Sequence, residues 1–139
     1  MSYATYLYAD MFVPYGSIAY RGKLRKAMHG ISYPLKDSIE TIASRVPNVP
    51  KTKIMLFTAA VMLYEDGVKK FTEHAIFQTV YRNLTNESPF DLHFKMSNNF
   101  ENLLTEEAFV LVEKVNRRYA LNAAVQEKLD AIIAGQKKS

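Results

Sequence analysis

The chain has 139 residues, a length that fits one domain with a hydrophobic core of its own. It contains no cysteine, which excludes disulfides, zinc–thiolate sites, iron–sulfur clusters and thiol nucleophiles, and which fits a cytoplasmic location. The formal net charge of +4 is uneven, because residues 1–53 hold eight basic and three acidic side chains whereas residues 54–139 hold ten and eleven. This basic N-terminal third permits a partner such as a nucleic acid or an acidic protein.

Residues 1–16 are rich in tyrosine and fit two interpretations. One is a strand over 5–13 that turns at 14–17 into a small N-terminal β-hairpin. The other is an aromatic helix that ends at Pro14, followed by a helix over 17–30 that Ser17 caps and Gly30 closes. The residues leave both alternatives open. They do not combine a charged with an apolar segment, so we expect no secretory signal.

The most apolar stretch of the chain is 54–64, in which only Thr58 is polar. A helix that is apolar on all sides must be surrounded by other elements. Because Pro50 and Gly67 frame the stretch, we predict a buried central helix at about 52–65. The stretch is too short for a bilayer, which needs about 20 apolar residues, so no membrane association is expected. A short amphipathic helix over 34–45 precedes it.

Three further helical segments are predicted after Gly67. The first covers 68–84, and a short one starts at Ser88 and Pro89 and breaks at 97–99. The longest covers 105–134, with inward positions that include Leu111 and Val115 and a kink or an end near Tyr119. Residues 135–139 are expected to fray.

These segments predict an all-α fold in a single domain, 1–139. Five to seven short helices would surround the central helix, and the N-terminal β-hairpin is the main alternative feature. We find no internal repeat and no second domain.

Catalytic or metal-binding patterns are not found in the sequence. His29, His74 and His93 lack the spacing of metal ligands, and no nucleophile or phosphate-binding motif occurs. His74 is expected to be a partly buried histidine with one hydrogen bond, and Asp91 a helix-capping residue. We therefore predict no enzyme activity, no cofactor, no metal and no small-molecule substrate. A pocket that joined His74 or His93 to a carboxylate would be needed to revive an enzyme hypothesis.

Two basic groups are the candidate binding residues. Arginine and lysine neutralise phosphates, and a neighbouring tyrosine can stack on an unpaired base. An ordinary solvated helix surface explains the same residues, and Arg118 could instead pair with an acidic residue of a neighbouring helix. The candidates are Tyr20, Arg21, Lys23, Arg25, Lys26, His29, Arg117 and Arg118.

The leading functional hypothesis is a non-enzymatic protein-binding module of the adaptor or inhibitor type. It would use the basic, tyrosine-rich N-terminal surface, with another protein or a second copy of the chain as partner, since tyrosine, methionine and arginine are frequent at interfaces. The alternative is a DNA- or RNA-binding protein that uses the segment 20–29 together with Arg117 and Arg118.

Overall fold

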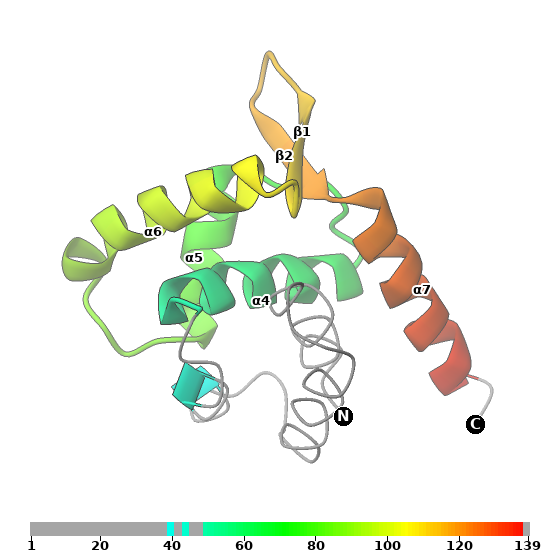
Figure 1. Ribbon diagram of the computed structural model, residues 1–139, viewed down its shortest axis with the longest axis horizontal. Helices are drawn as coiled ribbons and strands as arrows, with labels where there is room; N and C mark the ends of the chain where they lie inside the picture. The colour runs from blue at the N-terminus through cyan, green and yellow to red at the C-terminus, as the bar shows by residue number, and fades with distance from the viewer. Residues whose placement is uncertain (1–38, 41–42, 45–48, 138–139) are drawn as a thin grey trace.

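The computed structural model describes residues 39–40, 43–44 and 49–137. Four helices and two strands follow one another within 49–137 (Figure 1). They are α4 (Lys51–Glu65), α5 (Glu73–Asn83), α6 (Pro89–Thr105), β1 (Phe109–Glu113), β2 (Arg118–Leu121) and α7 (Ala123–Lys137). This part of the protein is mostly helical with a small antiparallel sheet, so the all-α prediction is right for the helices and misses the sheet.

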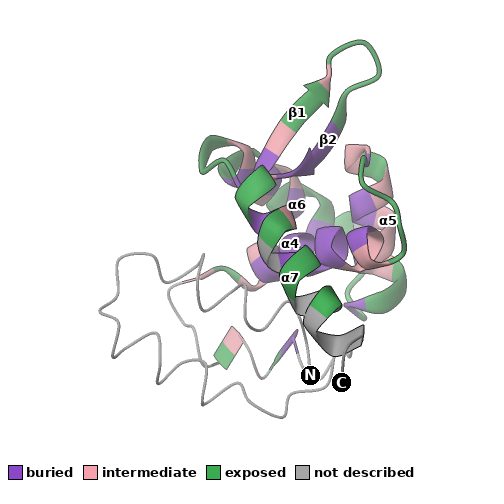
Figure 2. Ribbon diagram, turned by 90° about the vertical axis from the view of Figure 1, so that its right-hand side faces the viewer, coloured by how far each residue is buried: buried purple, intermediate pink, exposed green. Residues whose placement is uncertain are grey.

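Helix α4 is the buried centre of the described fold. Every residue from 54 to 61 is buried, and Figure 2 shows the helix enclosed by its neighbours. It contacts α5, α6 and β2, each of which covers part of its apolar circumference. The predicted central helix is therefore confirmed, with bounds that differ by one residue at its start.

Both ends of α4 follow from local chemistry. The carbonyl of Pro50 accepts the first helical hydrogen bond from Ile54 N at 3.2 Å. At the other end Gly67 has a φ of +88°, and Val68 N donates to the carbonyl of Leu63 at 2.8 Å. A glycine in this left-handed conformation commonly ends a helix, because residues with a side chain disfavour that conformation.

Helix α5 starts later than the predicted 68–84. Thr72 caps it by accepting a hydrogen bond from Ala75 N at 3.1 Å, and the helix proper begins at Glu73. Residue Phe71 instead forms an antiparallel bridge with Tyr119. Phe71 thus belongs to a sheet contact, which helical periodicity does not reveal.

Helix α6 begins as predicted and continues through the predicted break. The hydroxyl of Ser88 accepts a hydrogen bond from Phe90 N at 3.2 Å, and Pro89 occupies the first turn. Residues 97–99 remain helical, and Asn99 Nδ2 donates to the carbonyl of Lys95 at 2.9 Å. A buried stripe runs past this polar segment and packs the whole helix against the core: Leu92, Met96, Phe100 and Leu103.

The predicted helix over 105–134 is wrong for its first half, whereas residues 123–134 are helical in α7 (Ala123–Lys137) and the predicted inward residues Val125 and Leu129 are buried. Residues 109–121 form the β1–β2 hairpin, in which Phe109 pairs with Leu121 and Leu111 with Tyr119. Leu111 and Val115, which helical spacing placed inside, are exposed. The left-handed Glu107, at a φ of 62°, separates α6 from the hairpin.

Helix α7 begins after Asn122, whose Oδ1 accepts a hydrogen bond from Ala124 N at 2.7 Å. It runs to Lys137, so the predicted fraying is wrong for 135–137, and residues 138–139 lie outside the described part. The N-terminal β-hairpin and the helix over 17–30 also lie outside it. Of the predicted helix over 34–45, residues 39–40 and 43–44 are helical, and Ile39 is buried.

Aromatic rings join the sheet to the helices. Phe100 of α6 meets Phe77 of α5, Phe109 of β1 and Tyr119 of β2 at centroid distances of 6.2, 5.5 and 5.0 Å. Phe71 meets Phe109 edge-on at 5.3 Å. The hairpin is thereby anchored at its base while its turn projects from the body (Figure 1).

Candidate functional site

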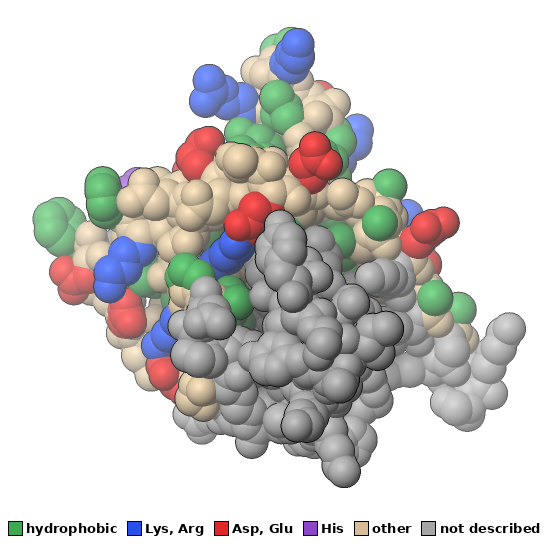
Figure 3. All heavy atoms as spheres, viewed as in Figure 1, with side chains coloured by type: hydrophobic (Ala, Val, Ile, Leu, Met, Phe, Trp, Pro, Cys, Tyr) green, Lys and Arg blue, Asp and Glu red, His purple; other side chains and the backbone are tan. Residues whose placement is uncertain are grey.

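The turn of the β1–β2 hairpin is exposed and basic. Val115 at its tip is 93% exposed, and the side chains of Lys114, Arg117 and Arg118 around it are exposed as well. Arg117 adopts a left-handed φ of 47°, and Asn116 Nδ2 donates to Glu113 Oε1 at 3.1 Å. Figure 3 shows Lys and Arg side chains on this projecting end of the molecule.

A single carboxylate lies among the cations of the hairpin strands. Glu113 Oε2 is 3.9 Å from both Lys70 Nζ and Arg118 Nη1. Ion pairs this long and this exposed contribute little to stability, at most about 1 kcal/mol each. Because one acid faces Lys70 and Arg118 while Lys114 and Arg117 lie nearby, the hairpin keeps an excess of positive charge.

The solvent-facing side of α6 is the second part of the candidate site. Phe90 is 91% exposed and Phe94 74% exposed, and they are four residues apart, so both rings lie on one face. Asn98 and Asn102 follow at the same spacing on the outside of α6 and are also exposed. Large exposed rings in the first turns of a helix indicate an interaction surface.

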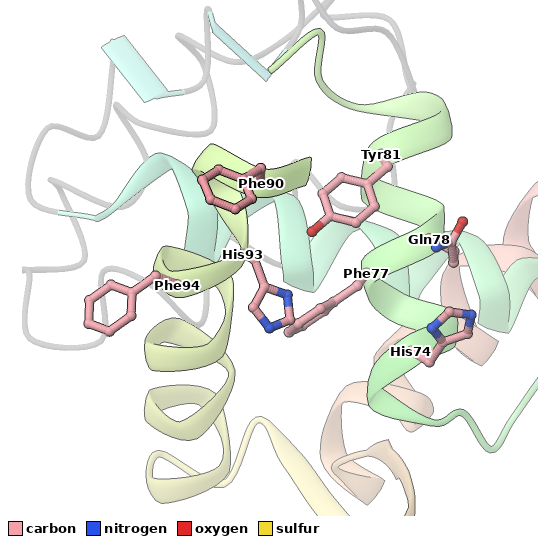
Figure 4. Close-up of a pocket in the computed structure, with 7 residues that line it drawn as sticks. All are labelled: His74, Phe77, Gln78, Tyr81, Phe90, His93 and Phe94. Atoms are coloured by element: carbon pink, nitrogen blue, oxygen red, sulfur yellow. The ribbon is translucent and has the colours of Figure 1, made fainter. Parts of the chain in front are cut away.

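A groove between α5 and α6 lies beside these rings. It has a volume of about 530 Å³, and its lining comes from both helices (Figure 4). Phe77 and His93 meet edge-on in it at a centroid distance of 5.5 Å. Burial raises the pKa of the Tyr81 hydroxyl above its ordinary value. The lining residues are His74, Phe77, Gln78, Tyr81, Phe90, His93 and Phe94.

The groove brings two of the histidines to one place without an acidic partner. His74 and His93 both line it, whereas none of its described lining residues is Asp or Glu. General acid–base catalysis by histidine usually relies on a carboxylate that orients the ring. His74 is exposed, so the prediction of a partly buried histidine is wrong, and Asp91 lies in the first turn of α6 as its predicted capping role requires.

Sequence reasoning located part of this site. Arg117 lies in the hairpin turn and Arg118 at the start of β2, where Arg118 approaches an acid of the adjacent strand rather than of a helix. The other predicted residues lie outside the described part: Tyr20, Arg21, Lys23, Arg25, Lys26 and His29. Phe90 and Phe94 were missed, because their spacing of four after the Ser88 cap places them on one face of α6 without indicating that this face is exposed.

Comparison with protein-family models, curated proteins and solved structures finds no match for this chain. Function must therefore be inferred from geometry. Within the described residues no cluster of His, Asp or Glu could hold a metal ion. No helix in that part of the chain combines the length and the apolar character needed to cross a bilayer.

Proposed function

We propose that this protein binds duplex DNA through α6 and the β1–β2 hairpin. The observation that carries the proposal is the bridge between Phe71 and Tyr119, which adds a strand residue from between α4 and α5 to the edge of the hairpin. The resulting order is helix, strand residue, helix, turn, helix and hairpin. This is the topology of winged helix-turn-helix domains, and the likeness is one of fold alone.

The placement of the exposed groups supports the same proposal. In a helix-turn-helix, the first helix crosses the DNA backbone and the second enters the major groove with its N-terminal residues against the bases. Here α5, the connection Leu84–Ser88 and α6 stand in that order. The major groove is about 12 Å wide and admits one helix. The cations of the hairpin would then contact phosphates beside that groove.

Fluorescence anisotropy with labelled duplexes over a range of salt concentrations tests the proposal. The logarithm of the affinity should fall linearly with the logarithm of the salt concentration. Removing the charges of Lys114, Arg117 and Arg118 together should make that slope shallower by up to about 3, since each phosphate contact contributes about 1. No binding to duplex DNA even at about 50 mM salt would refute the proposal.

Two controls sharpen this experiment. Lys69→Gln removes an exposed charge from the connection between α4 and α5, outside α5, α6 and the hairpin, and should leave the slope unchanged. A double-stranded RNA of equal length should bind more weakly, because its deep and narrow major groove does not admit a helix. Equal losses for Lys69→Gln and the hairpin variant would indicate non-specific charge attraction.

The segment 20–29 enters this proposal as a prediction from sequence. If it adds phosphate contacts, removing the charges of Arg21, Arg25 and Lys26 should reduce the salt slope further. An unchanged slope would restrict the DNA-binding surface to the described part of the chain.

Protein binding is the second candidate function, and the exposed rings of Phe90 and Phe94 favour it. A partner protein, a second copy of the chain included, would cover these rings with apolar side chains along the α5–α6 groove. Light scattering after size-exclusion chromatography should then show a complex or dimer that Phe90→Ser with Phe94→Ser disrupts. Such an apolar contact should persist at high salt, whereas DNA binding weakens. A strict monomer without a protein partner contradicts this candidate.

A further inference from the structure

We infer that the exposed face of α6 recognises thymine methyl groups and adenine edges, so that the DNA bound by this protein is rich in A·T base pairs. The inference rests on the proposed function, and it adds which bases the helix selects. Phe90, Phe94, Asn98 and Asn102 follow one another at a spacing of four and are all exposed. At about 100° per residue they lie within a sector of about 120° on the outside of α6, which Asp91 and Glu101 share, and we call this sector the reading face.

The core determines which way the reading face points. Leu92, Met96 and Phe100 lie on the other side of α6 and are at most 1% exposed. Phe100 also packs against the rings of Phe109 and Tyr119 in the hairpin strands. Because these contacts prevent α6 from rotating about its axis, the same side chains stay on the outside of the helix.

The chemistry of the reading face matches an A·T pair better than a G·C pair. In the major groove thymine presents its methyl group, which apolar side chains such as phenylalanine contact. Adenine presents N6 and N7, which the amide of asparagine can bind with two hydrogen bonds. Two phenylalanines in the first turns followed by two asparagines therefore offer both halves of A·T recognition.

Recognition of guanine would need different side chains. The commonest specific contact to guanine is a bidentate bond from arginine or lysine to O6 and N7. Helix α6 contains no arginine, and Lys95 is its only basic residue besides His93, which lines the groove with α5. Asp91 and Glu101 are exposed on α6 and could accept a hydrogen bond from cytosine N4. A measured preference for G·C duplexes would therefore indicate that these acids contact the bases, and it would overturn the inference.

Replacing thymine by deoxyuridine isolates the methyl contact, because the two bases differ only in that group. The full-length chain is titrated with alternating A·T, A·U and G·C duplexes at one salt concentration. The A·T duplex should bind tightest, and losing each contacted methyl group should weaken binding about four-fold. The double variant Phe90→Ala with Phe94→Ala should bind A·T and A·U duplexes equally. Both rings are exposed, so the variant should fold, which circular dichroism checks.

Asn98→Ala gives an independent readout of the adenine contact. It should reduce the preference for A·T over G·C duplexes and leave the difference between A·T and A·U duplexes intact. Equal binding of all three duplexes by the parent chain, or a methyl effect that survives loss of both phenylalanines, would overturn the inference while the proposed function stands. No binding to any duplex would overturn both.

Discussion

Phe71 and Tyr119 are joined by two backbone hydrogen bonds, from Phe71 N to Tyr119 O at 2.9 Å and from Tyr119 N to Phe71 O at 2.8 Å. The pair connects the segment between α4 and α5 to strand β2 of the hairpin. This contact holds the exposed turn, with Arg117 and Val115, at one fixed position beside α6. The spatial relation between the two proposed DNA-contacting elements therefore depends on it.

Truncating Phe71 should destabilise the protein strongly. The side chain is 3% exposed and contacts Phe109, so Phe71→Ala should lower the free energy of unfolding by about 3–5 kcal/mol through lost burial and the cavity left behind. Urea denaturation measures the change. Val68→Ala is a control from the same connection, and because Val68 is exposed its effect should stay below about 0.5 kcal/mol. Similar effects of both substitutions would contradict the anchoring role.

Substitution of Gly67 should act through the backbone alone. Its φ is +88°, and a Cβ built there would meet nothing within 4 Å, so space is not limiting. Gly67→Ala should cost about 1–2 kcal/mol because an alanine disfavours the left-handed conformation. Gly67→Asn should cost less, since asparagine tolerates that conformation. Thermal unfolding distinguishes the two, and an alanine variant as stable as the parent would contradict the explanation.

Glu65 should make stability fall as the pH rises. Its Oε1 is buried and has no hydrogen-bond partner among the described residues. Burial, assisted by the charge of Asp66, raises the pKa of this carboxyl from 4.5 to about 7 in the folded protein. Between these two values the folded state keeps a proton that the unfolded chain has lost, so raising the pH through this window favours unfolding.

Denaturant titrations at pH 5 and pH 8 test this expectation. Glu65→Gln should remove the part of the pH dependence of stability that comes from this carboxyl. The variant should be more stable than the parent at pH 8 but not at pH 5. Asp66→Asn should lower the pKa of Glu65 in the folded protein slightly and so narrow the pH window, because Asp66 is the smaller cause of the raised pKa. An equal gain from Glu65→Gln at both pH values would point to packing rather than to proton linkage.

The hydroxyl of Tyr64 ties α7 to α4. It donates a hydrogen bond of 2.6 Å to Asp130 Oδ1, and this bond raises the pKa of Tyr64 to about 12. Tyr64→Phe keeps the ring and removes the bond, so it should cost about 1–2 kcal/mol. Asp130→Ala should add little to a Tyr64→Phe background. Additive losses in this double-mutant cycle would show that the two residues act independently.

The sequence predicted those elements whose causes are local. The central helix is predicted by the apolar run 54–64. The start of α6 is predicted by Ser88 and Pro89, and the capping bond that Ser88 accepts from Phe90 N is present. The hairpin was missed because Phe109, Val110, Leu111 and Val112 were interpreted by helical spacing. Phe109, Val110 and Val112 are aromatic or β-branched and favour a strand, but that preference depends on having a partner strand to pair with.

Part of the candidate site could also be predicted from the sequence. Arg117 and Arg118 were identified as a basic interruption of an apolar stripe, yet the interruption proved to be a turn rather than a kinked helix. Phe90 and Phe94 could be recognised as exposed only once the buried stripe of α6 was known. The spacing of four places two residues on one face without indicating whether that face is inside or outside.

Composition and local pattern thus determined a helical domain with an enclosed α4, because a wholly apolar helix has no stable alternative in water. Only the tertiary structure decided that residues 109–121 form a hairpin and that α6 passes unbroken through 97–99. Both outcomes depend on contacts between residues far apart in the chain, above all the Phe71–Tyr119 bridge and the packing of Phe100. Such contacts stabilise strand pairing that no short stretch of sequence could favour by itself.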